Sequence, residues 1–396
     1  MNLTDVDDKT IRDSQKEHMK LRDFTNKYAK TFFEDIRTLN IKPAFVYPRA
    51  TDHIKEMIEI IKKLISKGYA YRSEDGSYYY KISKFKRYGK LANIKLKGQK
   101  AGARVNQDEY EKDNVQDFAL WKAWTPEDGD VYWETELGKG RPGWHIECSG
   151  MATKYLGNHF DIHCGGIDNM FPHHENEIAQ TEAATGEKFV NYWLHCAHLL
   201  VDGKKMSKSL GNFYTLRDLL TKGYSARAIR WTLLKSHYRQ SLNFTLQDLE
   251  ASENSIKRID EFMLNLESYK SNGSKKVNCN KFLKSFEKEM DNDLNISGAL
   301  GAVFEFIKEV NLVLQSNKLS LRSKEDCITT IKKFDIVLGI LKESETIPTE
   351  IKKLADQRLE ARKNKDWKES DRLRDLINTK GYSVDDTKEG YVVKVL

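Results

Sequence analysis

The segment 143–177 concentrates thiol, imidazole and carboxylate side chains, the groups that bind transition metals. Pro172 suits the first position of a helix. His173 and Glu177, four residues apart, would then project from one face of that helix. Cys148 would add a sulfur ligand from a separate segment. This pattern predicts a metal site that combines a sulfur, a nitrogen and an oxygen ligand.

The mixture of ligands indicates what kind of metal site this is. A closed structural zinc site usually takes four protein ligands, mostly cysteines, whereas mixed ligation with one position left open is typical of sites that bind a substrate. The sequence therefore predicts an open zinc site. His174 and Glu175 are alternative ligands, because a shift of one residue would turn them toward the metal. Cys164 lies in a Gly-rich turn and is expected to take no part.

A second chemical signal lies in the segment 201–212. Lys205 and Lys208 supply positive charges, and Ser207 and Ser209 supply hydroxyl groups. Glycines on both sides let such a segment move, and the composition suits a polyphosphate. Taken alone the signal is modest, because a basic, serine-containing loop in a Lys-rich chain is usually only solvated.

Together these segments resemble the class I aminoacyl-tRNA synthetases, and among them the cysteinyl-tRNA synthetases. The lysine-rich motif, Lys-Met-Ser-Lys-Ser, indicates only the class, while the metal-binding segment is specific to the cysteinyl family. The resemblance runs in order through essentially the whole chain, in the segments 2–9, 48–53, 143–149, 171–180, 205–209, 237–243 and 358–367.

The resemblance implies that Cys148, His173 and Glu177 bind one zinc ion and that zinc takes the substrate cysteine as a thiolate. Serine is nearly isosteric with cysteine, and a pocket that relies on shape alone separates such pairs by only ~10–200-fold. An alcohol is a far poorer ligand for zinc than a thiolate. Editing of mischarged products would then be unnecessary.

The resemblance also assigns residues to the substrates. Thr4, Trp144, His163 and Asp168 would hold the amino acid around the metal, with Asp168 as partner of its ammonium group. Trp144 could equally be an aromatic core residue. The lysines and serines of the segment 205–209 would bind Mg·ATP and neutralise its β- and γ-phosphates as cysteinyl adenylate forms.

The apolar pattern and the resemblance divide the chain into four parts. Residues 1–213 would form an α/β catalytic domain of the Rossmann type, with an insertion at about 48–133. Residues 214–245 would form a connecting region. An α-helical bundle that binds tRNA would span 246–344, and a small α+β domain that binds the anticodon would span 350–396.

Inside the insertion, local patterns predict two elements. The apolar residues between Ile54 and Ile65 keep helical spacing. Two tyrosine-rich segments, 69–71 and 78–82, flank a Glu-Asp-Gly-Ser turn as the strands of a hairpin would.

The last part of the chain is expected to form two charged helices, 350–365 and 367–379, and a short hairpin. The resemblance implies that the anticodon of tRNA(Cys) is contacted by four residues, Arg362, Trp367, Asp371 and Asp386. A surface Trp beside basic residues suits stacking on an unpaired base. In the alternative interpretation, the Trp packs this small domain and the charges form pairs along the helices.

The sequence departs from the family near its N-terminus. Class I synthetases carry a His-Ile-Gly-His-type motif upstream of the Asn-Leu-Thr-Asp segment, which begins here at Asn2. The fourth zinc ligand, another Cys, lies in the same upstream region. We therefore expect the Rossmann-type domain to be N-terminally incomplete and the chain alone to activate cysteine poorly. Ala197 also stands where the family tends to have Gly.

The composition indicates which kinds of partner the chain can bind. A net charge of +7 and an isoelectric point near 8.8 fit an anionic partner such as RNA. The five cysteines have no paired spacing, and neither a signal peptide nor an apolar run of membrane-spanning length is present. A cytoplasmic monomer that makes no contact with membranes is expected.

The principal hypothesis is ATP-dependent ligation of L-cysteine to tRNA(Cys) through a cysteinyl adenylate. Two alternatives remain open. One is a catalytically impaired remnant that still binds zinc and tRNA. The other is a related ligase that joins activated cysteine to an amine, against which the anticodon-like C-terminal segment argues.

Overall fold

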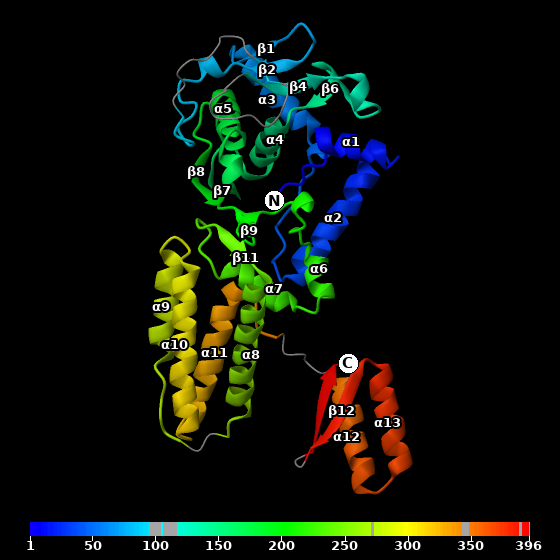
Figure 1. Cartoon of the computed structure of the whole chain (residues 1–396), viewed down its shortest axis with the longest axis vertical. Helices are drawn as coiled ribbons and strands as arrows, with labels where there is room; N and C mark the ends of the chain where they lie inside the picture. The colour runs from blue at the N-terminus through cyan, green and yellow to red at the C-terminus, as the bar shows by residue number, and fades with distance from the viewer. Residues whose placement is uncertain (95–103, 106–116, 271–272, 343–347, 388–389, 396) are drawn as a thin grey trace. The chain divides into compact units, whose positions relative to one another are not determined.

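The structure is a computed structural model that describes residues 1–94, 104–105, 117–270, 273–342, 348–387 and 390–395 (Figure 1). For a few of these residues, Lys208 among them, only the backbone is described. The chain separates into two compact units, Met1–Ile340 and Leu341–Leu396. Within the described residues, no helix is both long and apolar enough to cross a membrane.

The first unit begins with two helices, α1 (Asp8–Lys16) and α2 (Leu21–Thr38). A capping box starts α1: the Asp7 carboxylate accepts a hydrogen bond from the backbone N–H of Thr10, and the Thr10 hydroxyl accepts one from the backbone N–H of Asp7. Ahead of this helix, Leu3 forms a parallel bridge with Arg49. The N-terminal segment is thereby held against the segment that leads into α3 (Ile54–Ser66).

A six-stranded sheet follows, in the order β1–β2–β4–β6–β5 with β3 paired to β4. Its strands are β1 (Ala70–Arg72), β2 (Tyr78–Tyr80), β3 (Arg104–Val105), β4 (Asp117–Ala123), β5 (Trp133–Thr135) and β6 (Gly138–Pro142). In its core, the ring of Tyr80 stacks on that of Phe118 at 5.0 Å. The predicted helix and hairpin of the insertion are confirmed as α3 and the antiparallel pair β1–β2.

The next part of the unit is a β–α–β arrangement preceded by a helix. Its elements are α4 (Trp144–Leu156), β7 (Phe160–Gly166), the 3₁₀ turn η4 (Ile167–Met170), α5 (His173–Thr185) and β8 (Val190–Cys196). β7 and β8 pair in parallel, and α4 and α5 pack on each other and on α3 (Figure 1). Parallel strands joined through a helix are the repeating element of Rossmann-type domains.

A small three-stranded sheet carries the lysine-rich segment. Its order is β10–β9–β11, where β9 pairs antiparallel with β10 and parallel with β11. The elements of this region are β9 (Leu199–Val201), β10 (Lys204–Lys205), the 3₁₀ turn η5 (Lys208–Leu210), α6 (Leu216–Thr221), α7 (Ala226–Leu234) and β11 (Leu242–Phe244).

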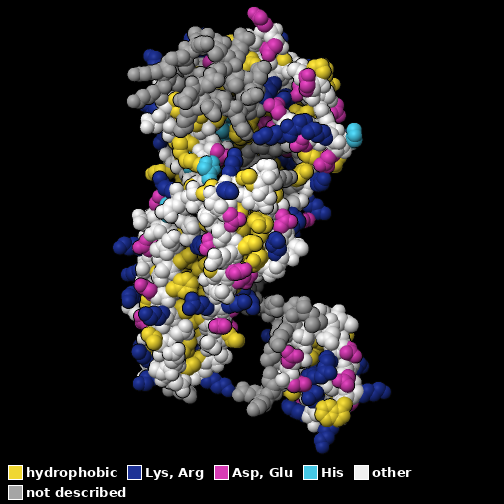
Figure 2. Space-filling view, in the orientation of Figure 1, with side chains coloured by type: hydrophobic (Ala, Val, Ile, Leu, Met, Phe, Trp, Pro, Cys, Tyr) yellow, Lys and Arg dark blue, Asp and Glu magenta, His cyan; other side chains and the backbone are white. Residues whose placement is uncertain are grey.

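A helical bundle completes the first unit. It consists of α8 (Leu246–Ser268), α9 (Cys279–Asp291), α10 (Ile296–Gln315) and α11 (Leu321–Leu338). Phe306 lies at its centre, and its ring meets those of Phe262, Phe282 and Phe334 edge-on, with centroids 5.6–6.1 Å apart. Hydrophobic side chains also gather on the outside of the bundle, on the face that Figure 2 shows.

The second unit confirms the two predicted helices and the hairpin. It contains α12 (Thr349–Lys363), α13 (Trp367–Thr379), β12 (Tyr382–Thr387) and β13 (Gly390–Val395). Its small core consists of Ile351, Ala355, Ile377, Val384 and Val393.

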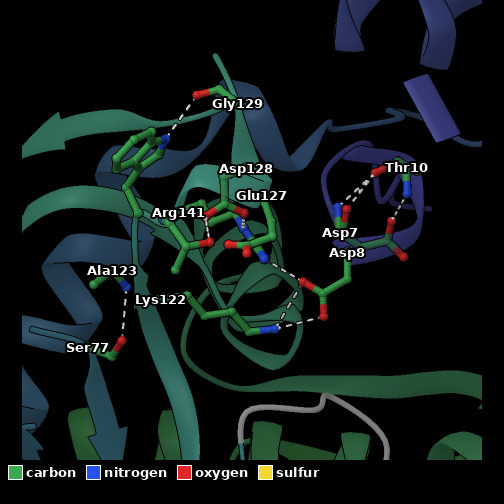
Figure 3. A network of polar contacts seen from close by, with 12 residues as sticks. Asp7, Asp8, Thr10, Ser77, Lys122, Ala123, Glu127, Asp128, Gly129 and Arg141 are labelled. Carbon is green, nitrogen blue, oxygen red and sulfur yellow. Dashed lines mark hydrogen bonds and ion pairs between the residues drawn. The ribbon is translucent and has the colours of Figure 1, made fainter. Parts of the chain in front are cut away.

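A network of ion pairs joins α1 to the six-stranded sheet (Figure 3). The Arg141 guanidinium on β6 is buried, and it binds Asp128 at 2.7 Å and Asp8 of α1. Lys122 on β4 also binds Asp8, at 3.1 Å. Burial alone would raise the pKa of Asp8, but the charges of these two cations outweigh burial and hold the pKa below its ordinary value. The network therefore fixes the end of β6, which leads directly into α4.

Candidate metal centre

Two helix starts bring the predicted metal ligands together. Cys148 lies near the beginning of α4, and His173 and Glu177 lie in the first turns of α5. His173 Nε2 is 3.2 Å from Glu177 Oε1 and 3.3 Å from Cys148 Sγ. One ligand atom of each residue lies within 4.8 Å of the others. The three side chains thus converge on one point, as the i,i+4 spacing in α5 predicts.

The electrostatics of this point fit a cation. The Glu177 side chain is fully buried, and neither of its carboxylate oxygens has a hydrogen-bond partner among the described residues. Burial raises the pKa of Glu177 well above its ordinary value. Burial, together with the charges of Glu177 and Glu147, does the same to the Cys148 thiol. A fully buried acid beside a half-buried thiol is costly unless a positive ion compensates them.

The neighbours of His173 fix its ring for ligation. His173 Nδ1 lies 3.0 Å from His145 Nδ1, which leaves Nε2 directed at Cys148 and Glu177. The Trp144 ring stacks on the His173 ring. Burial, with the nearby histidines His145 and His163, lowers the pKa of His173 well below its ordinary value. The ring is therefore neutral at physiological pH, the form that binds metals.

A second group of potential ligands shares Glu177. His163 Nε2 and His174 Nε2 lie 3.8 and 4.0 Å from Glu177 Oε1. One potential ligand atom of each of these three residues lies within 4.8 Å of the others. Burial is the main cause that lowers the pKa of His163 to about 4 and that of His174 to about 2. His174 therefore remains an alternative ligand on geometric grounds. Glu175 belongs to neither group, because its carboxylate accepts hydrogen bonds from the backbone N–H groups of Gly89 and Ala92.

His195 is a neighbour of this site that sequence reasoning missed. It lies on β8, and its Nε2 is 2.8 Å from His174 Nδ1. The pairing of β7 with β8 also places Trp193 over His163, with centroids 4.7 Å apart. The only sequence signal was the excess of histidines in this region, since neither residue belongs to a recognisable motif.

Of the predicted substrate residues, His163 and Trp144 lie beside the potential metal ligands. Cys148 and His163 line a cavity of 660 Å³ that Asn2 and the exposed Cys164 also line. The amide of Asn2 donates a hydrogen bond of 3.4 Å to Cys148 Sγ. Trp144 is only half-buried, so it is not an ordinary core residue.

The other two predicted substrate residues are exposed. Thr4 lies in the N-terminal segment and Asp168 in η4, directly after β7. Asp168 Oδ1 would lie 2.3 Å from a Cβ atom at Gly166. The absence of a side chain at Gly166 therefore gives the Asp168 carboxylate room to fold back over the end of the strand.

The lysine-rich loop is closed by one buried amide. The Asn212 side chain accepts a hydrogen bond of 2.9 Å from the backbone N–H of Ser207, and it donates to the carbonyl oxygens of Val201 and Lys205. The hydroxyls of Ser207 and Ser209 lie 2.8 Å apart. Lys205 is exposed, and the side chain of Lys208 lies outside the described part of the structure.

A turn of the helical bundle contacts the segment that follows α7. Asp293, between α9 and α10, receives hydrogen bonds from three successive residues: its carbonyl oxygen binds His237 Nε2 at 2.8 Å, and its carboxylate binds Tyr238 and Arg239 at 2.6 and 2.7 Å. The Tyr238 carbonyl in turn accepts a hydrogen bond from the backbone N–H of Ala197, directly after β8. Sequence reasoning missed Asp293, because the contact spans more than fifty residues.

In the second unit, Trp367 is exposed, whereas Asp386 forms ion pairs with two arginines. The Trp367 side chain is 56% exposed, and the Arg362 guanidinium lies 5.5 Å from its ring centroid. Trp367 therefore does not pack the small core. Asp386 accepts two hydrogen bonds, of 2.7 and 3.0 Å, from the fully buried Arg358, and it also pairs with Arg362. Asp371 is exposed and lies 3.4 Å from Arg374, so charge pairing along the helices is also present.

The chain is similar to known proteins both in sequence and in structure. Residues 1–254 match the family model for the tRNA synthetases class I (C) catalytic domain, and residues 285–342 match the DALR domain. The chain is 50% identical to a protein named Cysteine--tRNA ligase from Protochlamydia amoebophila, covering all of this chain and 84% of that protein. It is also 50% identical to one of the same name from Brachyspira hyodysenteriae, covering 98% and 85%.

Two similar solved structures are more distant in sequence. One is a methionyl-tRNA synthetase from Mycobacterium tuberculosis, with a TM-score of 0.55 and 11% identity over 83% of this chain and 79% of that one. The other is a putative arginyl-tRNA synthetase from Campylobacter jejuni, with a TM-score of 0.52 and 14% identity over 82% and 70%. At these identities the likeness concerns the fold alone.

Proposed function

This chain belongs to the cysteine–tRNA ligase family of class I aminoacyl-tRNA synthetases, and from this premise we propose that it joins L-cysteine to tRNA(Cys) in an ATP-dependent reaction. Similarity over the whole chain supports the proposal. It also argues against the amine-ligase alternative, since the relatives named above are tRNA ligases.

One observation carries the chemical part of the proposal: both oxygens of the buried Glu177 carboxylate lack hydrogen-bond partners among the described residues, beside His173 and Cys148. We propose that these three residues bind one zinc ion. Zinc bound there would supply a ligand position for the sulfur of the substrate, which serine fills poorly because an alcohol is a weak zinc ligand.

The protein's own residues would orient this centre and the amino acid. Trp144 and His145 hold the His173 ring, and the Asn2 amide donates to the Cys148 sulfur. We propose that Thr4, Trp144, His163 and Asp168 surround the bound amino acid. The exposed carboxylate of Asp168 would pair with its ammonium group.

The segment 205–209 would act on ATP. We propose that Lys205 and Lys208 neutralise the β- and γ-phosphates of Mg·ATP, with Ser207 and Ser209 as hydrogen-bond donors. The carboxylate of cysteine would attack the α-phosphorus, and pyrophosphate would leave. The terminal hydroxyl of tRNA would then attack the adenylate and release AMP. The position of Asn212, which ties both sides of the loop together, supports a loop that is ordered around phosphates.

The chain would divide into a catalytic region and further parts, two of which bind tRNA. We propose a catalytic region at 1–213 with an insertion at about 48–133, a connecting region at 214–245, a tRNA-binding bundle at 246–344 and an anticodon-binding domain at 350–396. In the last of these, the exposed ring of Trp367 and its neighbour Arg362 suit stacking on a base. A protein with this role in translation would act in the cytoplasm, and we propose that it does so as a monomer.

The test measures metal content and amino acid selectivity on the purified chain. We expect one zinc ion per chain by elemental analysis. Isothermal titration of the zinc-loaded chain should then give an affinity for L-cysteine at least ~100-fold higher than that for L-serine. Equal affinities, or a chain without zinc, would refute the assignment of the site. Cysteine-dependent exchange of pyrophosphate into ATP tests the adenylate step separately.

A further inference from the structure

Two cysteines outside the proposed metal centre face each other in the helical bundle. Cys279 is the first residue of α9 and Cys327 lies in α11, and their Sγ atoms are 3.6 Å apart. Both are free thiols. Cys279 is half-buried and therefore accessible to a small reagent, whereas Cys327 is fully buried.

The backbone holds the two helix starts side by side. Lys275 forms a parallel bridge with Leu319, and the backbone N–H of Ser320 donates to the Lys275 carbonyl at 3.0 Å. Two residues later, the N–H of Val277 donates to the Ser323 hydroxyl at 2.9 Å. These contacts join the segments that precede Cys279 and Cys327. The fold itself therefore holds the two thiols close together.

The environments of the two sulfurs differ in a way that gives them different roles. Cys279 receives a hydrogen bond from Cys327, which lowers the pKa of the Cys279 thiol, while the same bond and burial raise the pKa of Cys327. The position of Cys279 as the first residue of α9, at the positive end of the helix dipole, also favours a thiolate. Cys279 is thus the thiol that attacks first, and the buried Cys327 is the thiol that reacts second.

We propose that Cys279 and Cys327 form a modification site for peroxides, at which they are oxidised reversibly to an intrachain disulfide. The Cys279 thiolate attacks one peroxide oxygen, and the O–O bond breaks to give a sulfenic acid and water. The Cys327 sulfur then attacks the Cys279 sulfur, and the sulfenic oxygen leaves as a second water. The two thiols lose two electrons in total, and hydrogen peroxide is reduced to two waters. A dithiol reductant reverses the modification.

The disulfide would join α9 to α11 across the part of the chain that contains α10. The loop that it closes includes the α9–α10 turn, where Asp293 contacts the segment 237–239. Closing a loop of this length restricts the unfolded chain. We therefore expect oxidation to raise the temperature at which the bundle unfolds.

The test treats the full zinc-loaded chain with hydrogen peroxide, blocks the remaining thiols and maps the peptides by mass. We expect a linked pair of peptides containing Cys279 and Cys327, two hydrogen atoms lighter than the free peptides, which dithiothreitol separates again. In Cys327→Ser, Cys279 should stop at a sulfenic acid that dimedone traps. In Cys279→Ser, Cys327 should remain unmodified.

Cys164 and Cys196 provide an internal control, because both are exposed and lie on the paired strands β7 and β8. If exposure alone governed oxidation, these two would react first. Faster loss of their thiols than of Cys279, in protein whose circular dichroism is unchanged, would overturn the proposal. So would conversion of Cys279 to a sulfinic acid without the linked peptides.

Discussion

The indole ring of Trp144 stacks on the imidazole of His173, with ring centroids 4.1 Å apart and planes inclined by 22°. The two residues come from the starts of different helices, α4 and α5. The contact therefore joins both helices at the point where the potential metal ligands converge. The contact covers one face of the indole ring, and the rest of the ring is left partly accessible.

The first prediction concerns this contact. Trp144→Ala should weaken zinc binding by about tenfold, because the groups that orient a metal-binding histidine typically contribute ~10–100-fold to metal affinity. Trp144→Phe keeps a stacked ring and should stay within about threefold of the original affinity, less than the loss on removing a supporting group altogether. Competition with a chromophoric chelator measures both. Equal zinc affinity in the two variants would show that the stacked ring does not support the site.

The second prediction concerns the Glu177 carboxylate. Glu177→Gln preserves the shape of the side chain but removes the charge, so the purified protein should contain little or no zinc while remaining folded. Glu175→Gln is the matched control, because the Glu175 carboxylate accepts backbone hydrogen bonds, among them those from Gly89 and Ala92, and belongs to neither group of potential ligands. It should keep its zinc and lose about 1–3 kcal/mol of stability. Loss of zinc in the control but not in Glu177→Gln would reverse our assignment.

The third prediction concerns the turn that carries Asp293. Asp293→Ala removes the carboxylate that binds Tyr238 and Arg239, and so frees the segment that accepts a hydrogen bond from Ala197. We expect cysteine-dependent pyrophosphate exchange to fall below the low rate expected of the unsubstituted chain, with unchanged zinc content. Asp291→Ala, an exposed change near the same turn, should leave the exchange rate alone. An equal decrease in both variants would point to a general loss of stability.

The fourth prediction concerns the exposed Trp367. Trp367→Ala should weaken binding of tRNA(Cys) by ~5–150-fold, the range that corresponds to the loss of one stacked base, about 1–3 kcal/mol. Zinc content and cysteine binding should not change. Trp367→Phe should recover part of the affinity, because a smaller ring still stacks. Filter binding with the same tRNA measures all three proteins, and unchanged affinity in the Ala variant would exclude the anticodon contact.

The fifth prediction concerns the acid stability of the second unit. Hydrogen bonds from Arg358 hold the pKa of Asp386 below its ordinary value, with the charges of Arg358 and Arg362 acting in the same direction. A lowered pKa in the folded state stabilises above the unfolded value of about 3.9, and this contribution is lost as the pH falls through the folded pKa. Amide exchange in α12 and α13 should therefore accelerate below about pH 4.

Asp386→Asn tests the same pair at neutral pH. It leaves the fully buried Arg358 without its charged partner, so we expect the second unit to lose about 2 kcal/mol. This is less than the ~3–5 kcal/mol typical of a fully buried pair, because the Asp386 side chain is 35% exposed. Asp371→Asn removes an exposed charge and should change stability by less than about 0.5 kcal/mol. Equal amide exchange in the two variants would contradict a structural role for Asp386.

Local spacing was enough to foresee part of this molecule. A face of α5 presents His173 and Glu177 because residues four apart are neighbours on any helix, and the tyrosines around residues 70–80 form the predicted hairpin. The class I synthetase fold could likewise be foreseen from motifs that keep their order along the chain. Such features depend on short stretches of sequence, where chemistry and geometry are directly linked.

Other features depend on contacts between distant segments, and these could not be foreseen. His195 reaches His174 only because β8 pairs with β7, and Asp293 meets His237 across two intervening helices. Asp386 was expected to contact a base of the anticodon, yet its carboxylate also accepts a hydrogen bond from a buried arginine 28 residues away. No periodicity in the sequence distinguishes an arginine that is buried from one that is exposed.

The ion pairs around Arg141 have a consequence for the proposed substrate selectivity. Arg141 stands two residues before Gly143, where the backbone of α4 begins against Ala119 so closely that a Cβ would lie 2.2 Å from its carbonyl oxygen. Asp8, a residue of the first helix, thus pairs with the residue that leads into the helix carrying Cys148. We therefore expect a substitution at Asp8 to alter the proposed preference for cysteine over serine, although no residue that lines the cavity changes.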